Sequence, residues 1–340
     1  MKAFSSASTP SLTSVTRKII YSQRRSNIWQ RWLPIVLFIS LLVIIIVEVI
    51  LRNVYGFTDA VLFKNDAQFE YIAIPQRRFR FRKHIFYNRY SQRNREINPL
   101  DSIAVLSFGD SVINGGTQTD QDSLATTGLS AYLSQKYDKH LLVVNISAGS
   151  WGPDNCYAYL KKYGNFGAKS ILLVVSSHDA YDDMNHEKVV GILPNYPDKQ
   201  YSLAIAEAFS RYLFPRLRAQ LFSDKKNSQA VKNESFQSDS VLVNKYYPGV
   251  KFNRGFAQFK HYADSTNSKL LIYLHAERSE MIAKKYNTQG DEIINFCSIN
   301  SIPIIKELDY HFTEQDYRDD NFHLSEQGQR RMLNILKKYY

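Results

Sequence analysis

Ile103-Ala104-Val105-Leu106-Ser107-Phe108-Gly109-Asp110-Ser111 is the stretch from which the fold of this chain can be inferred. Its first part is a short, continuous apolar run, and such runs are typical of strands buried on both faces of a parallel sheet. The run ends in Gly109-Asp110-Ser111, so the Ser111 hydroxyl is expected at the carboxyl edge of the predicted strand. Ligands bind at this edge in open α/β sheets. The tripeptide alone is a weak signal, because short motifs recur by chance and need structural context.

Further apolar runs of similar length follow along the chain. Helical stretches separate them, for example around residues 124–136 and 154–163. Alternating strands and helices are typical of a three-layer α/β/α domain built around a parallel sheet. The predicted strands are Ile103–Ser107, Leu141–Val144, Ser170–Val175, Leu270–Leu274 and Ile302–Ile305.

A separate apolar segment at residues 33–51, LPIVLFISLLVIIIVEVIL, is long enough to cross a membrane as a helix. Its one charged residue, Glu48, lies close to its carboxyl end. Residues 1–32 contain six Lys and Arg residues and no acidic residue, so the positive-inside tendency places them in the cytoplasm. The rest of the chain is then periplasmic or extracellular. A cleaved signal peptide is the alternative, but it would carry a small-x-small cleavage site, which residues 52–55 do not offer.

Residues 52–100 are predicted to connect this single transmembrane helix to the α/β domain. Within the connector, residues 77–83 alternate basic and aromatic side chains, the period-2 pattern of a strand with one buried face. We expect an edge strand with Phe79 and Phe81 facing inward. A basic strip that binds lipid headgroups or an acidic polymer is the alternative.

The α/β domain is predicted over residues 101–340, with an insertion around 185–250. Within the insertion, Ser223–Ser240 reads as an exposed loop, and Pro215 is expected to kink a helix. An amphipathic segment is expected to dock on the domain, and a position on the membrane surface is the alternative. Its apolar face carries Ile205, Phe209, Tyr212 and Leu213.

The composition agrees with a packed globular body, since 44% of the 340 residues are hydrophobic and 14% are aromatic. The net charge of +11 indicates attraction to anionic surfaces such as phospholipid headgroups or acidic glycans. The membrane segment argues against nucleic acid as the partner. Cys156 and Cys297 leave open one disulfide or two buried thiols. The chain has no CxxC motif and no Cys/His spacing typical of zinc, so neither a metal nor a cofactor is expected.

Asp320-Asn321-Phe322-His323 supplies the context that the first motif needs. A serine hydroxyl is a poor nucleophile until a neighbouring base removes its proton. His323 is the candidate base, and Asp320 is positioned three residues earlier to orient its ring and stabilise the imidazolium. Without this pair, a helix-capping role would be the better interpretation of Ser111.

Two other strand ends carry candidate oxyanion donors. The second strand is followed by Gly149-Ser150, whose backbone N–H groups are expected at the same sheet edge as Ser111. The third is followed by His178, whose ring N–H can donate to the same oxygen, although a merely polar strand end is an equal alternative. The spacing of His178, Asp182 and His186 would align metal ligands on a helix, but a polar loop is the favoured interpretation. His275, after the fourth strand, is expected at the rim of the site.

These motifs, in this order over roughly residues 102–340, resemble the SGNH/GDSL hydrolase superfamily. The resemblance implies a flavodoxin-like fold and ester chemistry without a metal. It implies Ser111 as nucleophile, Asp320 and His323 as the other triad members, and Gly149, Ser150 and His178 as oxyanion donors. Two departures stand out. The glycine of the second family motif falls on Ser150, and the third motif reads Ser-Ser-His-Asp where the family has Gly-x-Asn-Asp.

The expected function is therefore that of a membrane-anchored serine esterase acting on O-acyl groups of an envelope polysaccharide. An O-acyltransferase on the same glycans, a lipid esterase, a metallohydrolase and a non-catalytic glycan-binding module are the alternatives. The sequence leaves open the acyl group, its acceptor and the oligomeric state.

Overall fold

The computed structural model describes residues 12–214, 216–217 and 251–340, and their side chains from residue 31 onward. The exposed loop predicted at 223–240 and the kink predicted at Pro215 lie outside the described residues.

A parallel sheet of five strands forms the centre of the domain, in the order β6-β5-β7-β8-β9. Numbered along the domain, this is the order 2-1-3-4-5 of flavodoxin-like folds, so the predicted fold class is confirmed. All five predicted strands are present, and the last begins two residues later than expected. Their bounds are β5 Ser102–Gly109, β6 Leu141–Ser147, β7 Ser170–Ser176, β8 Lys269–His275 and β9 Ile304–Lys306.

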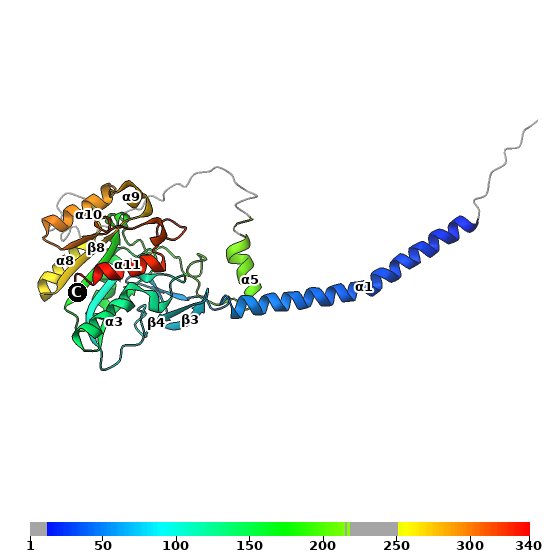
Figure 1. Ribbon diagram of the computed structural model, residues 1–340, viewed down its shortest axis with the longest axis horizontal. Coiled ribbons are helices and arrows are strands. Elements are labelled where there is room, and N and C mark those ends of the chain that lie inside the picture. Colours follow the sequence, from blue (N-terminus) through cyan, green and yellow to red (C-terminus); the bar gives the residue numbers. More distant parts are fainter. Residues whose placement is uncertain (1–11, 215, 218–250) are drawn as a thin grey trace, which may run out of the picture.

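Helices cover both faces of this sheet (Figure 1). Successive residues of a strand point to opposite faces. Val105 accordingly packs in the hydrophobic cluster on one face of the sheet, with Leu129 and Met332. Leu106 packs in the hydrophobic cluster on the opposite face, with Phe259 and Phe296. The first cluster is covered by α3 (Ala125–Tyr137) and α11 (Glu326–Leu336), and the second by α4 (Pro153–Tyr163), α8 (Arg254–Thr266) and α10 (Thr288–Ile299).

Two antiparallel hairpins make up much of the connector: β1 (Phe63–Asp66) with β2 (Glu70–Ala73), and β3 (Gln76–Arg80) with β4 (Lys83–Tyr87). The single strand expected over residues 77–83 is wrong, because Phe81 and Arg82 adopt φ values of 50° and 63° and turn the chain.

The expected orientation of the basic and aromatic residues in β3 is also wrong. Arg80 is buried, whereas Phe79 and Phe81 stay half-exposed. The reason is a partner far along the chain: the Arg80 guanidinium donates to the Glu207 carboxylate at 2.6 Å and to the Gly56 carbonyl at 3.0 Å. A buried cation is stable in a protein only when it is paired in this way.

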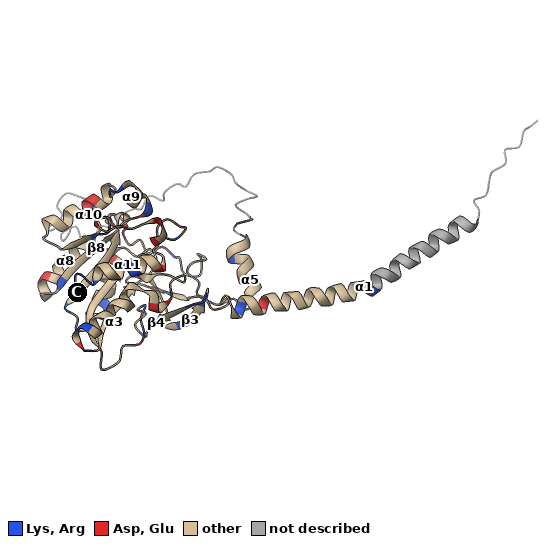
Figure 2. Cartoon of the chain, in the orientation of Figure 1, with Lys and Arg blue, Asp and Glu red and all other residues tan. Residues whose placement is uncertain are grey.

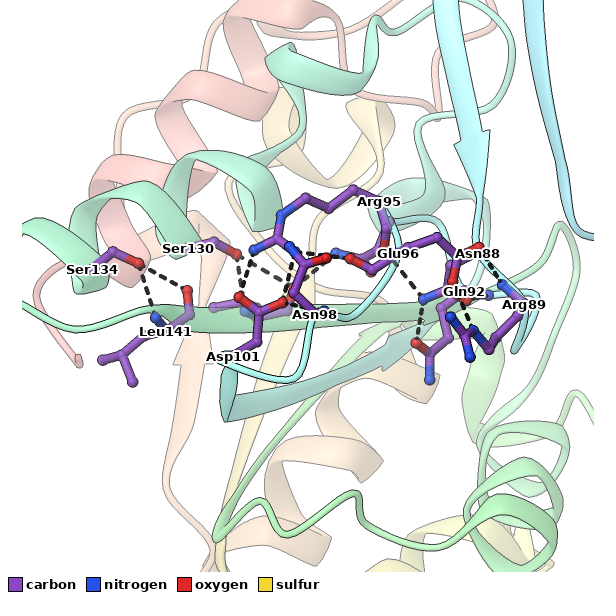
Figure 3. Close-up of polar contacts among 12 residues, drawn as sticks. Asn88, Arg89, Gln92, Arg95, Glu96, Asn98, Asp101, Ser130, Ser134 and Leu141 are labelled. Atoms are coloured by element: carbon purple, nitrogen blue, oxygen red, sulfur yellow. Dashed lines mark hydrogen bonds and ion pairs between the residues drawn. The ribbon is translucent and has the colours of Figure 1, made fainter.

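Polar contacts bind the loop after β4 to strand β6, since the Asn94 side chain donates to the Val143 carbonyl at 3.0 Å and accepts from the Asn145 N–H at 2.6 Å. Other polar contacts hold the loop itself and the start of β6 in place (Figure 3). Arg95 donates to both carboxylate oxygens of Asp101, at 2.7 and 2.8 Å. Asn88 donates to the Gln92 side chain at 2.8 Å, and Ser134 of α3 donates to the Leu141 carbonyl at the start of β6. The connector is therefore a structured part of the body that contains the sheet.

The first helix, α1, runs from Leu12 to Asn53. Its part from Arg31 to Asn53 has a mean hydropathy of 3.1, and the side chains there are exposed. In Figure 2 this stretch is almost free of charged residues, apart from its two ends. Its length and composition make it a candidate membrane span, and a signal sequence meets the same criteria.

Candidate active site

The first motif forms a tight turn from strand to helix. β5 ends at Gly109, and the short helix α2 (Ser111–Asn114) begins at Ser111. The Asp110 carboxylate accepts a hydrogen bond from the Val112 N–H at 2.8 Å and so caps this helix. Position 109 requires glycine, because a Cβ there would lie 2.7 Å from the Val174 carbonyl oxygen of the adjacent strand β7. Gly109 and Asp110 therefore each have a structural role, and together they hold Ser111 at the sheet edge.

The candidate base and its orienting carboxylate are in contact. Asp320 Oδ2 lies 2.8 Å from His323 Nδ1, and its Oδ1 accepts from the backbone N–H groups of Phe322 and His323 at 3.1 and 2.8 Å. Partial burial raises the pKa of Asp320, but these N–H donors and the imidazole outweigh it and leave the pKa below its usual value. An ionised Asp320 accepts a hydrogen bond from Nδ1–H, which keeps the proton on Nδ1 and leaves Nε2 of His323 as the basic nitrogen.

His275 is fully buried beneath this loop, so its expected place at the rim of the site is wrong. Nδ1 lies 2.9 Å from the Glu307 carboxylate, and Nε2 lies 3.0 Å from the Phe322 carbonyl oxygen. Both partners accept hydrogen bonds only, so the ring makes both bonds when it carries a proton on each nitrogen. Burial lowers the pKa of His275, but Glu307 and the Phe322 carbonyl outweigh it and raise the pKa.

Glu307 links this contact to the body of the domain. Its carboxylate also accepts from the hydroxyls of Tyr273 and Tyr317, at 2.9 and 3.2 Å. The network therefore fixes the peptide directly before His323. Sequence reasoning missed Glu307, and the available signal was weak: an acidic residue directly after the last apolar run.

One cavity of about 590 Å³ brings together all six residues that the sequence singled out. Ser111, Asp320 and His323 line it, and so do Gly149, Ser150 and His178. The cavity is also lined by residues that sequence reasoning did not assign to the site, from the hairpins, α2, the insertion and the C-terminal loop. Among these are Arg80, Tyr87, Asn114, Tyr196, Tyr212 and Arg318.

Ser150 adopts the backbone conformation of the glycine that it replaces. Its φ is 56°, in the left-handed region that favours glycine. The neighbouring Gly149 lies close to Tyr196, since a Cβ at 149 would be 3.2 Å from the Tyr196 hydroxyl. The turn after β6 thus keeps a glycine-like shape even though the glycine has moved by one position.

His178 lies in the short 3-10 helix Ser177–Ala180, at the end of β7. Its Nδ1 is 3.5 Å from a Glu277 carboxylate oxygen, and its Nε2 is 3.8 Å from Asp179 Oδ1. Burial lowers the pKa of His178, but Glu277, Asp179, Asp110 and Asp182 outweigh it and raise the pKa to about 10. At neutral pH His178 is therefore an imidazolium with N–H groups on both sides of the ring.

Carboxylates surround this imidazolium. Burial raises the pKa of Asp182 to about 6, against the charge of His178. Asp110, His178 and Asp179 each bring one potential metal-ligating atom within 4.8 Å of the others. Ion pairing with a protonated His178 accounts for the same arrangement. The helical alignment of His178, Asp182 and His186 is absent from the described residues, because the 3-10 helix ends at Ala180.

Comparisons with solved structures return esterases and lipases at low identity. TesA is matched with a TM-score of 0.41 and 11% identity, over 70% of this chain and 97% of that chain. The lipase/acylhydrolase from Enterococcus faecalis is matched with a TM-score of 0.38 and 11% identity, over 70% of this chain and 95% of that chain. An acetyl xylan esterase from Geobacillus stearothermophilus is matched with a TM-score of 0.36 and 10% identity, over 71% of this chain and 94% of that chain. No protein-family model matches the chain, and no curated protein matches it.

Proposed function

We propose that this chain is a serine esterase of the SGNH type, held at a membrane by α1, that acts on O-acyl groups of an envelope polysaccharide. The observation that carries the proposal is the contact between Asp320 and His323 in the same cavity as Ser111. The three residues come from the two ends of the domain, more than two hundred positions apart in the sequence. A nucleophile, a base and a carboxylate that orients the base are the minimum for acyl transfer through serine.

In the proposed mechanism, Nε2 of His323 removes the Ser111 hydroxyl proton as Oγ attacks the ester carbonyl. The oxyanion that forms is stabilised by N–H groups of the Gly149-Ser150 turn and by the His178 imidazolium. The C–O bond to the alcohol then breaks, and His323 returns the proton to the departing oxygen. Water, activated by His323 in the same way, attacks the acyl-enzyme and releases the acid. A sugar hydroxyl in place of water would make the protein an acyltransferase.

The cavity lining supports a glycan rather than a lipid acyl chain. Most of its residues carry polar or charged side chains, including three tyrosines and three arginines. Sugar hydroxyls need donors and acceptors of this kind, whereas a long acyl chain needs an apolar trench. After residue 32 the chain has 37 Lys and Arg residues against 32 Asp and Glu residues, and this smaller positive excess agrees with an acidic polymer.

The test is to treat the full chain, in detergent, with a fluorophosphonate probe and a chromogenic acetyl ester. We expect labelling of Ser111 and turnover, both abolished in Ser111→Ala and both kept in the matched control Ser123→Ala, which is outside the cavity lining. Loss of a triad nucleophile lowers kcat by about 10⁶-fold.

Other outcomes would favour the alternatives. Neither labelling nor turnover in the wild-type chain would refute the esterase and support a glycan-binding module. Turnover that survives Ser111→Ala and disappears with a chelator would support a metallohydrolase. Transfer of the acetyl group to an added sugar, faster than its release to water, would identify an acyltransferase.

A further inference from the structure

The helical segment that begins at Ala204 exposes its apolar side chains. α5 (Ala204–Ala208) continues as a π-helical turn over Phe209–Leu213, and residues 214, 216 and 217 are helical as well. Residues three and four apart share one face of a helix. The apolar face formed by Phe209, Leu213, Phe214 and Leu217 is 48%, 49%, 49% and 39% exposed, respectively.

The polar face of the same segment points toward the protein. Glu207 is fully buried, and its carboxylate pairs with Arg80 at 2.6 Å and with Arg211 at 2.9 Å. The Tyr212 hydroxyl accepts from Arg80 at 3.1 Å. This is the reverse of a helix docked on a soluble protein, where the apolar face lies inward. The segment docks on the domain, as expected, but through Glu207, Arg211 and Tyr212. The inward position expected for Phe209 and Leu213 is wrong.

The segment is attached to the carboxyl end of α1. The Glu48 carboxylate accepts hydrogen bonds from the backbone N–H groups of Ala204 and Ile205, at 2.8 and 2.9 Å. These are N–H groups that the first turn of a helix leaves without a partner. Arg52 donates to the Ser202 carbonyl at 2.8 Å. In Figure 1, α5 begins beside the end of α1 and runs across its direction.

We propose that residues 203–214, 216 and 217 lie in the membrane interface, with the apolar face of Phe209, Leu213, Phe214 and Leu217 in the boundary between headgroups and acyl chains. The inference rests on α1 spanning the membrane, as in the proposed function. A helix that crosses the end of a spanning helix lies in the plane of the bilayer, and such helices bury their apolar face by about 5–10 Å. The exposed Arg216 on the same segment is suited to bind anionic headgroups.

This placement brings the cavity to the bilayer. Arg211 and Tyr212, on the inward side of the segment, line the cavity that contains Ser111. One helix with its side chains is about 10–12 Å across. The cavity is then separated from the lipid by the thickness of a single helix, and the substrate is a polymer held or made close to the membrane surface.

Site-directed labelling of the full chain in lipid vesicles tests the inference. Cys156 and Cys297 are buried free thiols, so an environment-sensitive maleimide labels introduced cysteines selectively. Phe209→Cys and Leu213→Cys place the label on the apolar face. Ile299→Cys is the matched control: an apolar residue, 60% exposed, at the end of α10. In Figure 1, α10 lies far from α1.

We expect labels at 209 and 213 to shift to the blue and to be quenched most by lipid that carries a nitroxide near the headgroup. The label at 299 should show neither effect. Val43→Cys, midway along the apolar part of α1 from Arg31 to Asn53, reports on the anchor, and its label should be quenched most by a nitroxide at the bilayer centre.

If 209 and 213 behave like 299 while 43 is quenched, α1 spans the membrane and the inference on the apolar face is refuted. If 43 is unquenched as well, the anchor and the inference fail together. In either case, labelling of Ser111 by the fluorophosphonate reports separately on the esterase.

Discussion

Replacement of His178 tests the least conventional part of the proposed site, its imidazolium oxyanion donor. His178→Ala removes the N–H donor at the end of β7 and leaves the backbone N–H groups of the Gly149-Ser150 turn. Loss of one oxyanion donor lowers kcat by about 10²–10³-fold, or about 2.7–4 kcal/mol. The Glu277 carboxylate, 3.5 Å from the ring, would then lack its cation and repel the oxyanion. We therefore expect the upper end of that range.

The assay is kcat/KM for a chromogenic acetyl ester, measured across the pH range around the pKa of His178, which is about 10. In the wild-type chain, activity should fall as pH rises through this pKa, because the ring loses one of its two N–H donors. His178→Asn supplies a neutral amide donor instead. It should recover part of the activity that alanine loses, and its profile should lack this alkaline limb.

A stability measurement separates this effect from unfolding. The pKa of His178 is raised from 6.5 to about 10, so its ion pairs stabilise the fold fully below pH 6.5, and this stabilisation is lost as pH rises through 10. Denaturation midpoints at pH 7 for the wild type and both variants show whether lost activity comes from lost structure. Wild-type kcat/KM in a folded His178→Ala variant would refute the oxyanion role.

Two further substitutions probe the supports of the site. Glu207→Gln removes the charge that balances the buried Arg80 and should lower the free energy of unfolding by about 3–5 kcal/mol; an unchanged denaturant midpoint would contradict the pairing. His275→Gln removes one of the two ring contacts, to Glu307 or to the Phe322 carbonyl. Because these contacts position the loop that carries His323, the substitution should lower kcat while KM stays near the wild-type value. Equal changes in kcat and KM of His275→Gln, or a loss explained by unfolding, would point to a purely structural role.

The sheet and the meeting of the site residues could be predicted from the sequence, for a simple physical reason. Strands buried on both faces appear as continuous apolar runs, and parallel strands deliver their carboxyl ends to one edge. The residues after β5, β6 and β7 therefore gather without any knowledge of side-chain contacts. The Asp320 to His323 contact is local, so its spacing of three residues is visible in the sequence.

Contacts between distant residues explain where prediction failed. Arg80 reverses the expected inward and outward faces of β3 because its partner, Glu207, is 127 positions away. His275 is buried rather than exposed because Glu307 and a backbone carbonyl satisfy both of its nitrogens. Alternation in a strand reports average hydrophobicity, and a single buried ion pair overrides it. The outward apolar face of Phe209, Leu213, Phe214 and Leu217 likewise depends on contacts with residues far earlier in the chain. Glu207 pairs with Arg80, and the Ala204 N–H donates to Glu48.

The junction after α1 has a consequence for how the protein samples its substrate. Phe57 N–H donates to the Leu51 carbonyl, Phe81 N–H to the Tyr55 carbonyl, and the Arg80 side chain to the Gly56 carbonyl. These bonds join the end of α1 directly to the folded domain, whereas a flexible linker would let a domain search a volume. On the proposed topology, Ser111 stays at one height above the bilayer. The rate of turnover is then set by the number of acyl groups per unit of membrane area. The effective concentration of a membrane-bound polymer is high even where its bulk concentration is low.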